Sequence, residues 1–348
     1  MQQLRTFLFL TMILAIATIT ACSSPQPAPP VTMAALATVP PPVNTEPTDP
    51  ASEPPTAVPP TLPPTATAEP LPAPTNTPIP ENIETPPPET AVFPNVNGIP
   101  VTDFVVLPPE VRQNVIAIFQ EGQARGRSAT TFSKLGDSTS LNPNFLGRFD
   151  DPANVNLGQY DYLQPTIDHF TGHFSRYGVS AKNGLHSWSV FDPLWADKKW
   201  CQANEDVLNC EFRLNNPSII FVRLGSNDAG SPDGYRYNMK QVIETSIENG
   251  VIPVLVTKAD RFEGEGNINN NILRELAIEL SVPILEFDIV SETLPNRGLK
   301  PNDVHMEEMI APHDFTMPET MQSGHAVHDL IALMMLDELR QIMVQAAN

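Results

Sequence analysis

Prolines are concentrated in the first quarter of the chain, and this distribution limits which residues can build a folded domain. The chain has 348 residues and 39 prolines, and 24 of these prolines lie between Pro25 and Pro94. Proline has no backbone N–H and favours extended conformations, so this stretch cannot form a packed core. The sequence therefore predicts a disordered Pro/Thr-rich tether over residues 23–95. The remaining residues, 96–348, are of normal length for one globular domain.

The first 22 residues predict export from the cell. Arg5 precedes an apolar run from Thr6 to Ala21, and Cys22 follows directly. One positive charge, a short apolar core and small residues at its end are typical of a secretory signal. The segment also resembles the bacterial lipoprotein signal, which implies that Cys22 carries acyl chains and anchors the protein to the membrane on its extracytoplasmic side. The alternative is an ordinary signal peptide in which Cys22 occurs by chance.

The other two cysteines, Cys201 and Cys210, are separated by eight residues. Export would place them in an oxidising compartment, where a pair this close can form a disulfide. Two free buried thiols are the alternative. A zinc site has less support, because no CxxC motif or nearby histidine accompanies the pair.

The chain is strongly acidic, with 40 acidic and 20 basic residues and a formal net charge of −20. Binding to nucleic acid requires clustered cations, and docking on anionic lipid requires them as well. The composition therefore argues against a nucleic-acid partner. It favours a neutral or weakly charged substrate, and membrane attachment through the lipidated N-terminus.

The globular part alternates between strand-like and helical patterns. Apolar runs typical of buried parallel strands cover residues 128–135, 217–224, 251–256 and 282–287. Helical patterns cover residues 235–248, 268–280 and 326–346. This alternation predicts a doubly wound α/β domain, in which binding sites form at the carboxyl ends of the strands.

Three short motifs after these strands carry side chains suited to nucleophilic catalysis. Ser138 follows the first strand in Gly136-Asp137-Ser138, and Asn227 follows the second in Gly225-Ser226-Asn227-Asp228. Asp303 and His305 lie ahead of the last helix. A serine nucleophile needs a base, and the base needs an orienting acceptor. Each motif alone is more often a turn or a helix cap, but their order along the chain favours a hydrolase.

Together these motifs resemble the SGNH hydrolases, also called the GDSL esterase/lipase family, over roughly residues 128–345. The resemblance implies a flavodoxin-like α/β/α sandwich with a parallel sheet, and ester hydrolysis without a metal or organic cofactor. It implies that Ser138 is the nucleophile, that His305 is the base, and that Asn227 is an oxyanion donor. It also implies that Gly178, in the segment from Arg176 to Ala181, completes the oxyanion hole, although the asparagine usual in that segment is replaced by Arg176.

The sequence departs from the family pattern around the histidine. The family's aspartate lies three residues before the histidine, but Asn302 occupies that position and Asp303 lies only two before. Asp303 is the expected orienting group; the Asn302 carbonyl and a Ser–His dyad are the alternatives. Residues 306–322 look inserted before the last helix and are candidates for a lid or a substrate wall.

The other histidines and the tryptophans allow further interpretations of the site. His313 precedes Asp314 and could pair with it, and a metal site built from His313, His325 and His328 is a weaker alternative. Three tryptophans fall within thirteen residues and could form a platform for a sugar; core or rim packing is the more common role of such residues. They are Trp188, Trp195 and Trp200.

The sequence thus predicts a surface-anchored serine ester hydrolase that acts on acyl esters, with acetylated glycans as one substrate class. A glycan O-acyltransferase of the same fold is the first alternative. The second is a binding lipoprotein without activity, in which the changed Asp–His spacing reflects loss of the site.

Overall fold

The computed structural model describes residues 94–141, 145–307 and 313–347. The predicted signal, Cys22 and nearly all of the predicted tether lie outside the described residues. The strands are β1 (Asn95–Val96), β2 (Ile99–Pro100), β3 (Val105–Val106), β4 (Ser128–Gly136), β5 (Val155–Asn156), β6 (Pro217–Arg223), β7 (Ile252–Val256), β8 (Ile284–Leu285) and β9 (His313–Asp314). The α-helices are α1 (Val101–Phe104), α2 (Pro109–Ala124), α3 (Gln164–His169), α4 (Val207–Asn215), α5 (Pro232–Glu248), α6 (Ile268–Leu280), α7 (Phe287–Ser291) and α8 (Gly324–Ala346).

A five-stranded sheet in the order β3-β8-β7-β6-β4 forms the centre of the domain. Strands β4, β6, β7 and β8 are parallel to one another. Beyond β4, a single parallel bridge joins Gly136 to Ala181, where a further strand would lie. Counting that bridge as a reduced second strand, the parallel part has the 2-1-3-4-5 order of flavodoxin-like folds.

The sheet has one antiparallel strand, at its edge. Strand β3 pairs antiparallel with β8, with Val105 opposite Leu285 and Val106 opposite Ile284. Strand β3 is only two residues long, so its pairing comes from tertiary packing rather than from a pattern that sequence periodicity can reveal. An antiparallel edge strand on an otherwise parallel sheet is common in such folds.

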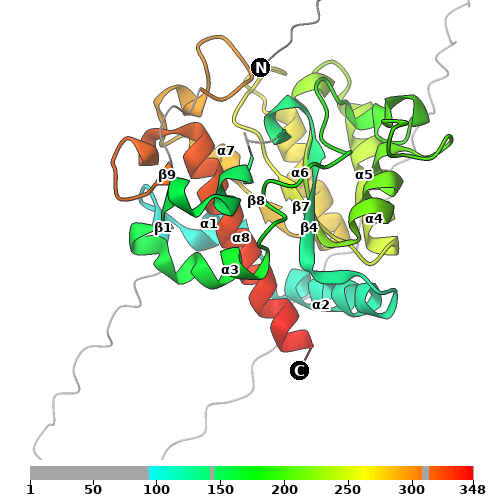
Figure 1. Ribbon diagram of the computed structural model, residues 1–348. Helices are drawn as coiled ribbons and strands as arrows, with labels where there is room; N and C mark the ends of the chain where they lie inside the picture. Colours follow the sequence, from blue (N-terminus) through cyan, green and yellow to red (C-terminus); the bar gives the residue numbers. More distant parts are fainter. Residues whose placement is uncertain (1–93, 142–144, 308–312, 348) are drawn as a thin grey trace, which may run out of the picture. The chain divides into compact units, whose positions relative to one another are not determined.

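Helices cover both faces of the sheet, which gives an α/β/α sandwich. Along β6, Ile219 and Phe221 enter one hydrophobic core, and Ile220 and Val222 enter the other. This division follows from the two-residue alternation of side chains along a strand. The first core contains the apolar faces of α2 and α8, and the second contains those of α4, α5 and α6. Figure 1 shows α8 crossing one side of the sheet and α4 and α5 on the other.

Helix α8 begins against a carboxylate from the loop before it. One oxygen of Glu307 accepts hydrogen bonds from the Ser323 hydroxyl (2.9 Å) and from the Gly324 N–H (2.5 Å). The first N–H groups of a helix have no partner within the helix, and a negative charge there is favourable. Glu307 therefore fixes the chain after His305 to the start of the longest helix.

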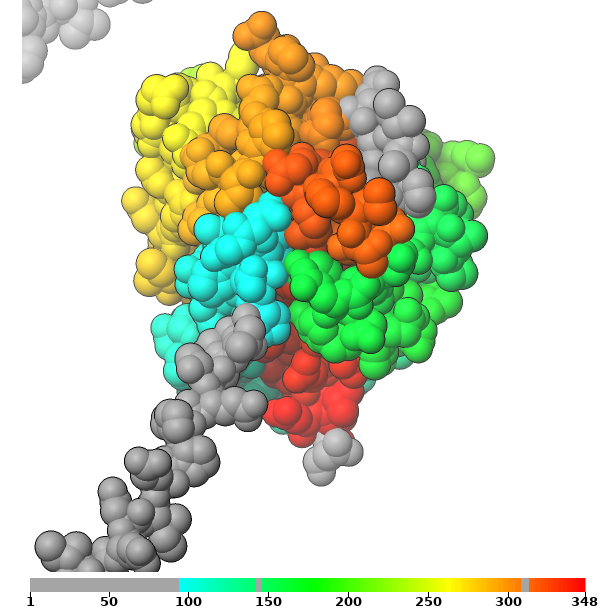
Figure 2. All heavy atoms as spheres, turned by 90° about the vertical axis from the view of Figure 1, so that its left-hand side faces the viewer, coloured from blue at the N-terminus to red at the C-terminus, as the bar shows by residue number. Residues whose placement is uncertain are grey.

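The segment 306–322, predicted as an insertion, is packed into the body of the domain where the structure describes it. Strand β9 pairs with β5 in parallel, and the Phe315 ring contacts the Tyr160 ring edge-on at 6.0 Å. Figure 2 shows this orange-red segment beside the green residues near 160 and the cyan residues that begin the domain. The described residues of this segment are therefore packed against the rest of the domain and do not form a separate lid.

The structure contains the disulfide between Cys201 and Cys210. It links the loop after Trp200 to α4, which packs on the sheet. None of the helices in the described ranges is both long and apolar enough to span a bilayer.

Candidate active site

The turn after β4 carries Ser138. Gly136 is paired with Arg223 at the end of β6, and a Cβ atom on Gly136 would lie 2.6 Å from the Arg223 carbonyl oxygen. Only glycine permits this close approach of the two chains. Residues 138–140 then form one 3₁₀ turn, and Ser138 is partly exposed at the carboxyl edge of the sheet.

Asp137 caps this turn. Its Oδ1 atom accepts hydrogen bonds from the Thr139 N–H (2.9 Å) and from the Thr139 hydroxyl (2.6 Å). A side-chain acceptor at this position satisfies an N–H group that the short helix leaves without a partner. The conformation of this turn is therefore set on both sides of Ser138.

A hairpin over residues 298–307 carries Asp303 and His305. The backbone N–H of Glu307 bonds the Gly298 carbonyl (3.2 Å), and the Lys300 N–H bonds the His305 carbonyl (2.9 Å). Asn302 lies in the turn of the hairpin with a φ of 57°, which asparagine tolerates better than most residues. The hairpin therefore places Asp303 and His305 on one side of the turn.

Ser138, His305 and Asp303 form a continuous chain of hydrogen bonds. The Ser138 Oγ atom lies 2.8 Å from His305 Nε2, and His305 Nδ1 lies 2.7 Å from Asp303 Oδ1. The structure thus brings the Asp303 carboxylate to the imidazole, although the spacing differs from the family's. The hydrogen bond from the His305 ring, together with those from the backbone N–H groups of His305 and Val304, lowers the pKa of Asp303 below its ordinary value.

The loop after β6 places Asn227 at the same edge of the sheet as Ser138. Gly225 has a φ of 129°, and its α-carbon lies against the Tyr235 ring, so the loop requires a glycine at this position. The exposed Asn227 side chain donates through Nδ2 to the Leu185 carbonyl at 3.2 Å. An amide nitrogen carries two N–H groups, so the second can serve an oxyanion.

Gly178 lies beside a buried carboxylate in the segment that leads to Ala181. It lies three residues before Ala181, which is bridged to Gly136, whereas Ser138 lies two residues beyond Gly136. Gly178 and Ser138 therefore lie on opposite sides of the Gly136–Ala181 bridge along the chain. Its α-carbon faces the buried carboxylate of Glu211, and a Cβ there would meet that carboxylate at 3.4 Å. The role of Gly178 as an oxyanion donor therefore stays a prediction, and its surroundings in the structure do not include Ser138 or Asn227 among the contacts of its α-carbon.

Gly184 is the glycine that lies beside Asn227. It immediately precedes Leu185, whose carbonyl accepts the Asn227 hydrogen bond, and it is exposed with a φ of 68°. Asp228 holds the following residues through the Ser187 N–H (3.1 Å) and hydroxyl (2.8 Å). The sequence contained a signal for this position, because Asn183-Gly184 is a typical turn dipeptide.

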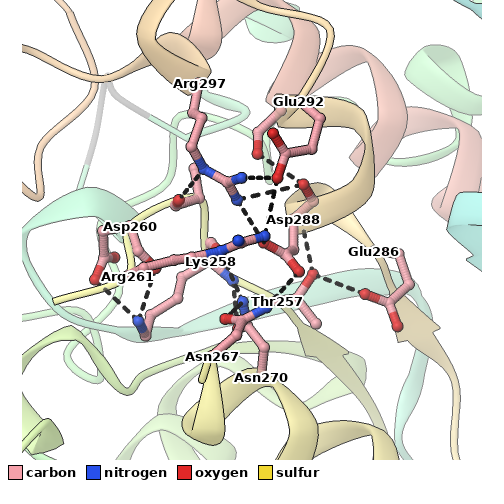
Figure 3. Close-up of polar contacts among 12 residues, drawn as sticks. Thr257, Lys258, Asp260, Arg261, Asn267, Asn270, Glu286, Asp288, Glu292 and Arg297 are labelled. Carbon is pink, nitrogen blue, oxygen red and sulfur yellow. Dashed lines mark hydrogen bonds and ion pairs between the residues drawn. The ribbon is translucent and has the colours of Figure 1, made fainter. Parts of the chain in front are cut away.

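A network of charged side chains supports the loop that carries Asn227. Buried Lys258 donates to Asp260 Oδ1 (2.9 Å), and the other Asp260 oxygen accepts from the Ser226 hydroxyl (2.7 Å). Figure 3 shows Lys258, Asp260 and their neighbours at the ends of β7 and β8. The residue next to Asn227 is thus fixed by a buried ion pair, which favours a preorganised site.

The same network supports the start of the hairpin. Arg297 Nε donates to the Ala259 carbonyl at 2.7 Å, and Nη2 lies 2.5 Å from Asp288 Oδ1 (Figure 3). Burial alone would raise the pKa of Asp288, but hydrogen bonds from Arg274 and Asn267 and the charge of Arg297 keep the pKa below its ordinary value. Asp288 therefore stays ionised and holds the arginine that precedes the hairpin.

A cavity of about 880 Å³ opens beside Asn227 and Asp303. Its lining is mostly polar and includes Asn296, and the Phe262 side chain at its wall is 71% exposed. Both of the arginines that line it, Arg261 and Arg297, are ion-paired with carboxylates of the protein. The cavity therefore offers hydrogen-bonding groups to a ligand.

The alternative histidine sites do not form. His313 is buried, and its Nε2 atom lies 2.8 Å from Asp329, not from Asp314. His328 is fully buried between the rings of Phe145 and Phe287, and burial lowers its pKa well below the ordinary value. Within residues 94–141, 145–307 and 313–347, the one group with metal-ligand spacing is Cys201, Glu205 and Cys210, whose cysteines form the disulfide.

The three tryptophans divide into two places. Trp188 and Trp195 pack edge to face with ring centroids 6.1 Å apart, and Trp188 is 53% exposed next to His186. Trp188 lies in the loop that Asn227 and Asp228 hold, and Trp200 lines a different hollow, with Tyr177.

Comparisons with known proteins give similarity at the level of solved structures. No protein-family model matches the sequence, and no curated protein matches it. The chain is similar to a lipolytic protein of the G-D-S-L family from Desulfitobacterium hafniense, with 13% identity and a TM-score of 0.34, over 59% of this chain and 99% of that one. It is also similar to a GDSL-like lipase from Bacteroides thetaiotaomicron, with 13% identity and a TM-score of 0.36, over 65% and 98% of the two chains. Because one fold hosts many activities, function is inferred below from the side chains of this chain.

Proposed function

We propose that this chain is a serine ester hydrolase of the SGNH type. The observation that carries the proposal is the hydrogen-bond chain from Ser138 through His305 to Asp303, with steps of 2.8 Å and 2.7 Å. A hydroxyl, an imidazole and a carboxylate in this order are the parts that activate a serine nucleophile. The site lies at the carboxyl edge of the sheet, where open α/β folds bind their substrates.

The reaction follows from the roles of these groups. His305 Nε2 takes the proton of Ser138 Oγ as that oxygen attacks the ester carbonyl carbon. The Asp303 carboxylate stabilises the imidazolium that forms. The tetrahedral intermediate collapses when His305 returns its proton to the leaving alcohol, and an acyl-serine remains. Water then repeats the sequence, releases the acid and restores Ser138.

The negative oxygen of the intermediate needs donors on the other side of the carbonyl. The proposed donors are the backbone N–H of Ser138, the Asn227 amide and the backbone N–H of Gly184. Asn227 and Gly184 are adjacent through the Leu185 carbonyl, which accepts the Asn227 hydrogen bond. Fixed donors that need no rearrangement during the reaction give the largest stabilisation.

The surroundings of the site favour acyl esters of a polyhydroxylated alcohol, such as acetylated glycans. The cavity beside Asn227 has a volume of about 880 Å³, which exceeds what an acetyl group requires. Its polar lining suits hydroxyl groups, and the exposed Trp188 ring on the neighbouring loop suits the apolar face of a sugar. The acidic chain and the paired arginines disfavour a strongly anionic substrate.

Attachment to the cell surface completes the proposal. Cys22 at the end of the apolar segment would carry the acyl chains, and the Pro/Thr-rich residues after it would separate the enzyme from the membrane. Replacement of Cys22 by alanine should abolish incorporation of radiolabelled palmitate. Labelling that persists in this variant would exclude Cys22 as the lipidated residue.

The activity is tested with the full-length protein and p-nitrophenyl acetate, butyrate and octanoate. Wild-type protein should release nitrophenol, and Ser138→Ala should not. Release of acetate from O-acetylated xylan fragments then tests whether a glycan ester is a substrate. Absence of hydrolysis by the wild type on all of these esters would contradict the proposal, and activity retained by Ser138→Ala would exclude Ser138 as the nucleophile.

A further inference from the structure

A buried arginine lies directly beneath the nucleophile turn. Arg223 is the last residue of β6, pairs with Gly136 in the sheet, and has 1% of its side chain exposed. It faces the same core as Phe221, two residues earlier, because side chains alternate along a strand. At this position an apolar side chain would continue the core, so the guanidinium requires an explanation.

The guanidinium contacts both residues that flank Ser138. Its Nη1 atom donates to the Thr139 hydroxyl and lies 3.6 Å from Asp137 Oδ1. Asp137 in turn accepts from the Thr139 N–H and hydroxyl. Arg223, Thr139 and Asp137 therefore form a closed set of contacts with the Ser138 backbone held between them.

Burial of the Arg223 guanidinium costs free energy that packing alone does not explain. A buried cation is unfavourable unless it is paired, and Asp137 is the carboxylate that faces it. Within the described residues, Nε and Nη2 of Arg223 and Oδ2 of Asp137 have no hydrogen-bond partner. A pair retained with unsatisfied atoms favours a role in fixing one geometry of the turn over a role in stability.

We propose that Arg223 is a positioning residue for Ser138, an inference that rests on the proposed hydrolase function. By holding Asp137 and Thr139, the guanidinium keeps Ser138 Oγ at 2.8 Å from His305 Nε2. Without it the turn can adopt other conformations, and Ser138 meets His305 in only a fraction of the molecules.

The test measures the rate at which a small fluorophosphonate labels Ser138 in the full-length protein. In this reaction a bond forms between Ser138 Oγ and phosphorus, fluoride leaves, and His305 takes the serine proton. The rate reports the Ser138–His305 geometry and needs no knowledge of the natural ester. Thermal unfolding of each variant, followed by circular dichroism, gives the folded fraction.

Arg223→Met is expected to lower the labelling rate per folded molecule at least tenfold, and Arg223→Lys should recover part of the rate. Thr139→Val, which keeps both charges and removes the contact, should lower the rate as well and serves if Arg223→Met does not fold. The control is Lys134→Met, which removes a buried cation of the neighbouring strand that donates to the Phe145 and Phe174 carbonyls. Its labelling rate per folded molecule should equal that of the wild type.

The outcomes separate this inference from the proposed function. Wild-type labelling rates in folded Arg223→Met and Thr139→Val, even with a lower unfolding temperature, would overturn the positioning role. Labelling that depends on Arg223 in a protein that hydrolyses no ester would support the positioning role and contradict the hydrolase. Absence of Ser138 labelling in the wild type would overturn both.

Discussion

A single oxygen of Asp303 accepts hydrogen bonds from two nitrogens of His305. Asp303 Oδ1 lies 2.7 Å from the ring Nδ1 and 3.2 Å from the backbone N of the same histidine. The carboxylate and the imidazole are thus joined within one turn, two residues apart. The ring bond fixes which nitrogen faces Ser138, because an imidazole that donates through Nδ1 presents Nε2 as the acceptor.

Replacing the acid should separate its role from that of its neighbour. Asp303→Asn is expected to lower kcat on p-nitrophenyl acetate on the order of 100-fold with little change in KM, because the imidazolium loses its carboxylate. Asn302→Gly tolerates the same positive φ and should lower kcat by less than about fivefold. A larger effect at Asn302 than at Asp303 would assign the orienting role to the amide.

Removing the amide of Asn227 should affect the transition state more than substrate binding. Asn227→Ala is expected to lower kcat by about 10²- to 10³-fold while KM stays near the wild-type value. Gly178→Ala is the control, because the added methyl would meet Glu211 at an ordinary 3.4 Å. Its kcat should be that of the wild type, and a loss comparable to that of Asn227→Ala would return Gly178 to the site.

Buried Lys134 should make stability depend on alkaline pH. Burial lowers the pKa of Lys134 to about 8, from 10.5 in the unfolded chain. Between these values the unfolded state binds more protons, so stability rises with pH and then levels off. Relative to Lys134→Met, the free energy of unfolding of the wild type should increase by about 3 kcal/mol from pH 7.5 to pH 10.5 in urea titrations. A constant difference between the two proteins would show that Lys134 is not desolvated in the folded state.

The disulfide should contribute to stability without affecting the chemistry. The disulfide joins Cys201 to Cys210, with a sequence separation of 9. Its reduction is expected to lower the free energy of unfolding by about 2 to 3 kcal/mol. The double substitution to serine should lower the unfolding temperature by several degrees and leave kcat of the folded protein unchanged. If dithiothreitol does not change the unfolding temperature of the wild type, the disulfide is absent from the protein as prepared.

The exposed tryptophan on the Asn227 side should discriminate among substrates. Trp188→Ala is expected to raise KM for an acetylated oligosaccharide by about tenfold and to leave KM for p-nitrophenyl acetate unchanged. Trp200→Ala is the matched control, since this ring is also exposed but lines a different hollow. Equal effects of the two substitutions on the glycan ester would exclude a specific role of Trp188.

The elements that could be predicted from the sequence are the long ones with apolar runs. The runs over residues 128–135 and 217–224 correspond to β4 and β6, and the pattern over residues 268–280 corresponds to α6. The run over residues 282–287 contains β8. Strand β3 has only two residues, too few for a periodic signal, and its pairing depends on packing between distant segments. Sheet order therefore could not be read beyond the parallel strands.

Prediction of the site residues depended on whether each lies next to a strand end. Ser138 and Asn227 directly follow long buried strands, so their place at the sheet edge follows from the topology. Gly178 precedes Ala181, whose single bridge to Gly136 stands in place of a full strand. The sequence pattern cannot show which residue forms such a bridge, and therefore cannot show which glycine follows it. Arg223 carried no signal, because a charged residue at a strand end is normally solvated.

Asp303 is bound to His305 through both the ring and the backbone, so the two residues can only be displaced together. Asp303 and His305 lie together on residues 298–307. Under the proposed function, displacement of this hairpin would remove the general base and its counterion in one step. The remainder of the fold, with Ser138 and Asn227 on the sheet, would persist as a binding surface without catalytic power. Glu307, which bonds the start of α8, ties the end of this hairpin to the body of the domain, so the positions of both residues depend on that contact.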